Sequence, residues 1–253
     1  MENLPRRLFS QQLLNSLLSF SLVKTLFTSD LLAKPVERIA HQWLIEMELM
    51  SKDLKRRKLK QSQWQVMVAD LFNRVELPDI LRAINFNDLS KKIKLSDERE
   101  AILEIAFPSL QDVPKDLTCS TIFEALKKGR AIAPHGHHNM ASLHLVLSGE
   151  VHLQQYDRVA DEATHLIVLP TVDKACGAGE LSTISDEKNN IHWFKGISDV
   201  TFIFNAGIYG LEPKKRLIGR DYIDPNRGEE LGGGRKRVRR LSQSEAFKLY
   251  NSV

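Results

Sequence analysis

The chain has 253 residues, of which 42% are hydrophobic and 27% are charged. A hydrophobic core is therefore expected and wholesale disorder is excluded. Lysine and arginine number 36 against 32 aspartates and glutamates, and the net charge of +4 is too small by itself to indicate a nucleic-acid partner. The two cysteines, Cys119 and Cys176, lie far apart in the chain, which excludes a disulfide framework and a CxxC metal or redox site.

Residues 1–33 are rich in leucine and serine, and two interpretations of them stay open. Arg6-Arg7-Leu8-Phe9 resembles the bacterial twin-arginine export signal, whose core is Arg-Arg-x-Phe. Lys24, Asp30 and the lack of a small-x-small cleavage site favour instead an N-terminal helix that packs on the domain. The first interpretation places the protein in the periplasm and the second in the cytoplasm. Polar residues interrupt the segment too often for a membrane span.

Residues 34–97 are expected to form a helical extension. Apolar residues recur there at three- and four-residue steps, first from Pro35 and again after Ser62, and Leu77 opens another short helix. The basic run over residues 55–60 is typical of a solvated helix face. No catalytic constellation lies in this part, so we expect these helices to pack against the domain that follows.

Residues 98–224 change to short alternating segments separated by turn residues, which indicates eight or nine antiparallel strands. Strands of this length and spacing predict a double-sheet jelly roll or barrel rather than a βαβ fold. Tyr209, just after the last expected strand, is a candidate for the mouth of a pocket. The expected strands are Ala101–Ala106, Ser120–Leu126, Arg130–Ala133, Leu143–Leu147, Val151–Tyr156, Thr164–Leu169, Leu181–Ser185, Ile191–Phe194 and Thr201–Asn205.

Residues 225–253 are expected to form a basic C-terminal tail that ends in a short helix, Ser244 to Tyr250. The most basic stretch of the chain lies here, over residues 232–240. No aromatic residues are interleaved with its arginines and no nucleic-acid-binding module accompanies them. We therefore expect a solvated tail, or one that lies over an acidic face of the domain, and no nucleic-acid partner.

Histidines cluster in the middle of the expected β domain. Five of the eight fall within eighteen residues, and two of these, His135 and His137, are two positions apart. Side chains two apart on a strand share a face, so both imidazoles can be presented to one ion. Imidazole is a favoured ligand of borderline transition metals. His138 is expected to be an exposed neighbour in a loop, and His152 a structural or surface residue.

The spacing around these histidines resembles the first cupin motif, G-x5-H-x-H-x(3,4)-E-x6-G. Here Gly129 is followed after five residues by His135-Gly136-His137 and after eleven more by Gly149. Ser142 stands where the family has its acidic ligand. The resemblance implies a mainly β chain, with a single cupin jelly-roll barrel and an N-terminal α-helical extension.

The missing carboxylate makes the chain most similar to the thiol dioxygenases, namely cysteine dioxygenase and the cysteamine and plant cysteine oxidases. These cupins bind one ferrous ion through three histidines. Their third ligand lies in a segment that resembles Asn190-Ile191-His192-Trp193-Phe194. The resemblance therefore implies Fe²⁺, or another divalent transition metal, held by His135, His137 and His192. The tyrosine and arginine that hold cysteine in that family have no clear counterpart in the sequence.

Three neutral imidazoles would leave the ion its full charge, which favours anionic ligands and the deprotonation of a bound thiol. Positions would stay open for a thiolate and for dioxygen, and the Ser142 hydroxyl is a candidate donor to a bound oxygen species. If Ser142 points inward, His144 does too. His144 is then a fourth ligand, an acid or base beside the ligands, or a core histidine bonded to backbone, and the last two are favoured.

These residues predict a metal-binding cupin that acts as a mononuclear non-haem iron oxygenase, with dioxygen and a small thiol or other small anionic molecule as substrates. Ser142 and His144 are its candidate catalytic residues. Two alternatives stay open. One is a non-enzymatic cupin that binds a metal or small ligand, and the other is a metal-dependent isomerase or lyase with His144 as acid or base.

Overall fold

The computed structural model describes residues 35–105, 107 and 116–251, with side chains from Gln42 onward. The segment 1–33, with its export-like arginines, lies outside the described residues. Residues Val36–Val253 form one compact unit. Among the helices of the described part, none is both long and apolar enough to cross a membrane.

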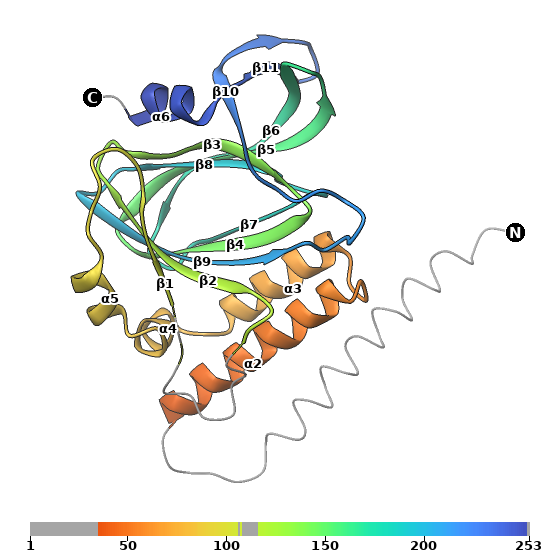
Figure 1. The fold of residues 1–253 in the computed structure, drawn as a ribbon. Helices are drawn as coiled ribbons and strands as arrows, with labels where there is room; N and C mark the ends of the chain where they lie inside the picture. The colour runs from red at the N-terminus through yellow and green to blue at the C-terminus, as the bar shows by residue number, and fades with distance from the viewer. Residues whose placement is uncertain (1–34, 106, 108–115, 252–253) are drawn as a thin grey trace, which may run out of the picture. The chain divides into compact units, whose positions relative to one another are not determined.

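Two antiparallel sheets make up most of the described chain (Figure 1). One sheet has five strands in the order β1-β2-β9-β4-β7, and six further strands, in the order β10-β11-β6-β5-β8-β3, form a closed barrel. The predicted fold class, a mainly β jelly-roll barrel with an N-terminal α-helical extension, is confirmed. The strands are β1 (Ala101–Glu104), β2 (Ser120–Lys127), β3 (Ala131–His138), β4 (Met140–Ser148), β5 (Glu150–Asp161), β6 (His165–Gly177), β7 (Leu181–Ser185), β8 (Ile191–Gly196), β9 (Val200–Tyr209), β10 (Ile218–Glu230) and β11 (Lys236–Arg240).

The N-terminal helices pack against the five-stranded sheet, as expected (Figure 1). The Trp43 ring lies 5.8 Å from that of Phe204 on β9, and the Phe72 ring lies 6.2 Å from it, measured between centroids. All three side chains are buried, so the aromatic cluster closes the outer face of this sheet. The helices are α2 (Pro35–Lys55), α3 (Gln61–Asn73), α4 (Leu77–Ala83), α5 (Phe86–Lys92) and, at the other end of the chain, α6 (Gln243–Asn251).

The C-terminal part differs from the expected tail. Strand β10 continues past residue 224. The arginine-rich segment forms β11, a strand of the barrel wall that pairs with β6 and β10. Its charges are neutralised locally, since Arg237 lies 2.7 Å from Glu162 and Arg240 pairs with Asp161 and Asp221. The expected barrel boundary at residue 224 and the expected solvated tail are therefore wrong. A run of basic residues is unfavourable in a sheet, but here ion pairs with acidic residues of other strands offset the repulsion. The short helix is confirmed as α6.

The aromatic contact between helices and sheet generates a stability prediction. Phe204→Ala should lower the free energy of unfolding by about 3–5 kcal/mol, because a fully buried ring is removed from a packed cluster. Urea denaturation measures this loss. Val66→Ala, on the 71% exposed position of α3, is the control and should change the free energy by less than about 0.5 kcal/mol. An equally small loss for Phe204→Ala would contradict the packing.

Candidate metal centre

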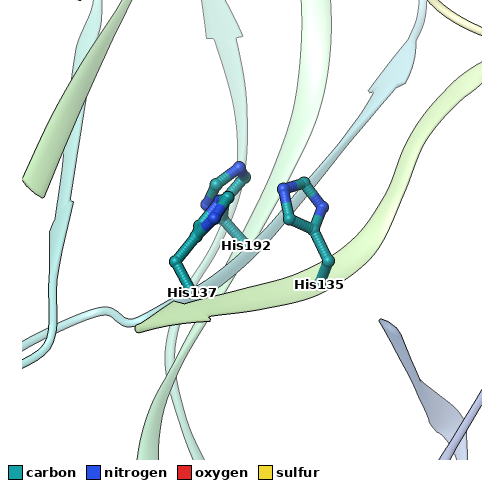
Figure 2. A group of neighbouring side chains, drawn as sticks. All are labelled: His135, His137 and His192. Carbon is teal, nitrogen blue, oxygen red and sulfur yellow. The ribbon is translucent and has the colours of Figure 1, made fainter. Parts of the chain in front are cut away.

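Three histidines from two paired strands converge inside the barrel. His135 and His137 lie on β3, and His135 stands directly opposite His192 of β8. The ring centroid of His135 lies 4.6 Å from that of His137 and 4.5 Å from that of His192. One ring nitrogen from each histidine lies within 4.8 Å of the others, and all three side chains are buried. Figure 2 shows the rings turned toward one another.

A bulge in β3 produces this pairing. Ile132 pairs with Phe194, but His135 rather than residue 134 pairs with His192, so β3 carries one extra residue. The residue at 134 is Pro134, which has no backbone N–H to donate and is tolerated at a bulge. Because a one-residue shift moves every following side chain to the other face, the bulge decides that the two imidazoles of β3 point inward. The expected end of this strand at Ala133 is wrong for the same reason.

Gly136, between the two β3 histidines, leaves room for a supporting network. A Cβ atom at this position would lie 2.6 Å from Nη2 of Arg158 and 2.9 Å from Oδ1 of Asn190. Asn190 is buried and donates to the carbonyl of His137 at 2.8 Å, while it accepts from Nε of Arg158 at 3.0 Å. The network therefore fixes the backbone that carries the histidines.

Each of the three histidines has a ring nitrogen available to a metal. Nδ1 of His135 donates to the carbonyl of Ala133 at 2.7 Å, and Nδ1 of His137 donates to the carbonyl of Gly219. These bonds place the proton on Nδ1 and leave Nε2 as the free electron pair, as in metal-binding imidazoles. His192 offers a buried Nδ1 that has no hydrogen-bond partner among the described residues. The donor set therefore fits a divalent transition metal.

Burial keeps these imidazoles neutral, which is the state that a metal requires. Burial, with the charge of Arg220 and the neighbouring histidines, holds the pKa of both His135 and His192 well below its usual value. Burial and the charges of Arg220 and Arg158 lower the pKa of His137 to about 3. Metal binding would therefore displace few protons from this site at neutral pH.

The five-stranded sheet supplies the opposite wall of the site. His144 on β4 stands directly opposite Asn205 on β9, and Asn205 Nδ2 lies 2.9 Å from His144 Nε2. Glu124 on β2 lies two residues beyond Ile122, the partner of Asn205, and therefore on the same face. Asn205 also hydrogen-bonds the Glu124 carboxylate. Glu124, Asn205 and His144 thus form a polar row across three adjacent strands.

The two walls border a cavity of about 70 Å³, a size that suits a small ligand. Several buried polar atoms around it lack a hydrogen-bond partner in the described part of the chain, including Glu124 Oε2, Ser142 Oγ and His144 Nδ1. Buried polar atoms are rarely left unpaired unless a ligand or water serves them. The cavity is lined by Glu124, Ile132, His135, His137, Met140, Ser142, His144, His192, Asn205, Tyr209 and Arg220.

A guanidinium and two carboxylates set the charge of the cavity. Arg220 Nη1 lies 2.6 Å from a carboxylate oxygen of the buried Glu100. Burial, together with the charge of Glu100, raises the pKa of Glu124 to about 7, although Arg220 and Asn205 oppose the shift. With Glu124 neutral, the cavity retains a cation–carboxylate pair. With Glu124 ionised, it is more acidic by one charge.

All five residues predicted from the sequence line this one cavity, but not in equal roles. His144 is outside the group of three histidines. Its Nε2 bonds Asn205 and its Nδ1 has no partner in the described part of the chain, so the interpretation as a core histidine bonded to backbone is wrong. Tyr209 lines the cavity as expected. His138 lies in β3 rather than a loop, is half-buried and contacts Nη1 of Arg158 at 2.7 Å.

Sequence reasoning missed Glu124, Asn205 and Arg220. Glu124 and Asn205 sit at inward-facing positions of expected strands, so the alternation could have indicated them. Arg220 lies on β10, which the sequence did not predict, and no local signal marks it.

Comparisons with known proteins find solved structures that are similar to this chain at low sequence identity. Neither a family model nor a curated protein matches the chain. Among solved structures, procruciferin, an 11S globulin from Brassica napus, is 14% identical with a TM-score of 0.33, over 46% of this chain and 27% of that one. Oxalate oxidase is 14% identical with a TM-score of 0.33, over 46% of this chain and 53% of that one.

A third similar structure is a conserved protein with a double-stranded beta-helix domain from Klebsiella pneumoniae. It is 13% identical with a TM-score of 0.35, over 48% of this chain and 82% of that one. This chain spans about a quarter of procruciferin and about half of oxalate oxidase.

The raised pKa of Glu124 generates a pH prediction for the metal-free protein. Its folded-state pKa of about 7 lies above the unfolded value near 4.3. The free energy of unfolding therefore falls as the pH rises from about 4.3 to about 7, because the folded protein resists ionisation of this carboxyl. Glu124→Gln removes that cost and should raise the free energy of unfolding, relative to wild type, by on the order of 1–3 kcal/mol more at pH 8 than at pH 5. Urea denaturation at both pH values measures it, and an identical difference at both would contradict the assignment.

Proposed function

We propose that the chain is a metal-binding cupin with Fe²⁺, or another divalent transition metal, held by His135, His137 and His192. The observation that carries this proposal is the convergence of three buried imidazoles, with ring nitrogens left free, on one small cavity. Two of the rings have a tautomer fixed by backbone carbonyls. When bound, the ion supplies open coordination positions for a small anion and for dioxygen.

The preferred activity is that of an oxygenase acting on a small thiol or other small anionic molecule. The cavity is small, and Arg220 lines it as the cation that would attract an anion. Arg220 and Tyr209 supply the residue types that the thiol dioxygenases use to hold cysteine. The unpaired Ser142 hydroxyl, which is 1% exposed, can donate to a ligand oxygen, and Ile132 and Met140 exclude water on the apolar side.

A specific observation also favours the second candidate, a metal-dependent isomerase or lyase. Such an enzyme needs a group that takes up and releases a proton beside the substrate. Burial lowers the pKa of His144 to about 3, so His144 is a poor base at neutral pH. Glu124, with its pKa raised to about 7 and one oxygen unpaired in the cavity, is the better acid or base for this alternative.

Metal content tests the ligand set. His135→Ala and His192→Ala should each lower the bound metal at least tenfold, because removing one of three ligands leaves too few to hold the ion. The measurement is elemental analysis of protein purified without added metal. His152→Ala is the matched control, since this histidine lies outside the cavity and pairs with Asp173; it should keep wild-type content. Full metal content in His135→Ala would overturn the proposed centre.

Oxygen uptake separates the candidate activities. Protein loaded with Fe²⁺ should consume dioxygen when a small thiol such as cysteine or cysteamine is added, and Arg220→Leu should raise KM for an anionic substrate more than it lowers kcat, because Arg220 is assigned to binding. A metal-loaded protein that consumes no dioxygen across thiols and small carboxylates would exclude the oxygenase and favour the isomerase, the lyase or a non-enzymatic binding role.

A further inference from the structure

The polar row of Glu124, Asn205 and His144 has a direction, because one of its hydrogen bonds can run only one way. Asn205 Nδ2 carries hydrogens and cannot accept, so the 2.9 Å contact requires His144 Nε2 to be the acceptor. A neutral imidazole whose Nε2 accepts must carry its proton on Nδ1. His144 is 4% exposed, its Nε2 contacts an amide rather than a carboxylate, and its Nδ1 has no partner among the described residues, so burial favours the neutral ring.

Glu124 holds the Asn205 amide in this orientation. When it is ionised, the Glu124 carboxylate only accepts hydrogen bonds, so it requires the NH₂ group of Asn205, not its carbonyl oxygen, on its side. If the amide were turned over, its oxygen would face the carboxylate and repel it. The row therefore runs from the Glu124 carboxylate through the two hydrogens of Asn205 to Nε2 of His144.

In this tautomer, the other ring nitrogen of His144, Nδ1, is a hydrogen-bond donor. Nδ1 is buried and has no partner among the described residues, and its ring lines the cavity 4.8 Å from the ring of His192. Ser142, two residues away on the same face of β4, presents a second buried and unpaired group, its hydroxyl. Leaving such donors unsatisfied costs stability unless a ligand serves them.

We propose that Glu124 and Asn205 fix His144 as the Nδ1–H tautomer, so that His144 donates a hydrogen bond to an anionic oxygen of a small carboxylate in the cavity. Glu124 and Asn205 are thus positioning residues, and His144 is a neutral donor rather than a proton acceptor or a fourth metal ligand. The ligand part of this inference rests on the proposed function, but the tautomer part does not, because it is a property of the chain alone.

Nitrogen-15 NMR of histidine-labelled, metal-free protein tests the tautomer, since the shifts of the two ring nitrogens identify which one carries the proton. His144→Phe, whose spectrum lacks one set of signals, assigns the His144 ring. We expect the proton on Nδ1 in the wild type. Asn205→Leu and Glu124→Leu should shift it toward Nε2, the nitrogen that free imidazole prefers to protonate. Glu124→Gln keeps an acceptor oxygen and should retain the Nδ1–H form.

Formate serves as the probe of the ligand part, titrated into metal-free and zinc-loaded protein. His144→Phe should weaken formate binding roughly fivefold, the loss of one hydrogen bond. Ser182→Ala is the matched control, because Ser182 flanks His144 on β7 as Asn205 does on β9 but does not line the cavity; it should leave formate affinity unchanged.

A wild-type proton on Nε2, or an Nδ1–H form that survives Asn205→Leu, overturns the tautomer. Formate affinity that is equal in wild type and His144→Phe, or absent in both, overturns the donor role. Loss of metal binding in elemental analysis would count against the proposed function alone and would leave the tautomer result standing.

Discussion

The pairing of β3 with β8 is the constraint on which the candidate centre depends. Two imidazoles two residues apart on one strand share a face in any regular register, but a third reaches them only if His192 stands opposite His135. The one-residue bulge around Pro134 produces this register. Without it, Pro134 would face His192 and the β3 histidines would turn to the other side of the strand. The candidate centre therefore depends on one extra residue of backbone as well as on the identity of three side chains.

The two sheets bring different properties to the cavity. The barrel strands contribute imidazoles that burial keeps neutral and that backbone carbonyls orient. The five-stranded sheet contributes a row of polar side chains whose hydrogen bonds run toward the cavity and leave donors unpaired there. Arg220, from β10, adds a cation that the buried Glu100 balances. A site of this kind can bind an ion on one wall and position a small anion from the other.

Much of the fold and part of the candidate site could be predicted from residues that lie close together in the sequence. The alternating pattern gave the positions of nine strands, and the spacing from Gly129 to Gly149 indicated His135 and His137. Inward alternation on β4 placed Ser142 and His144 on one face. The helices followed from their apolar period, and their packing on the sheet is seen in the contact of Trp43 with Phe204.

The features that were not predicted from the sequence depend on contacts between distant segments of the chain. The Arg-rich strand β11 was not predicted because its charges are tolerable only beside Glu162, Asp161 and Asp221, which other strands supply. Arg220 was missed with the strand that carries it. The partner of His144 could not be predicted either, since strand order, not sequence spacing, places Asn205 beside it.

X-ray absorption spectroscopy at the edge of the bound metal, on protein purified without added metal, measures the proposed coordination shell itself. If His135, His137 and His192 are the ligands, the spectrum should show a stoichiometric divalent transition metal with about three imidazole nitrogens at about 2.1 Å and the remaining positions filled by oxygen. A metal surrounded by sulfur, a shell with one imidazole or none, or no metal after loading would contradict it.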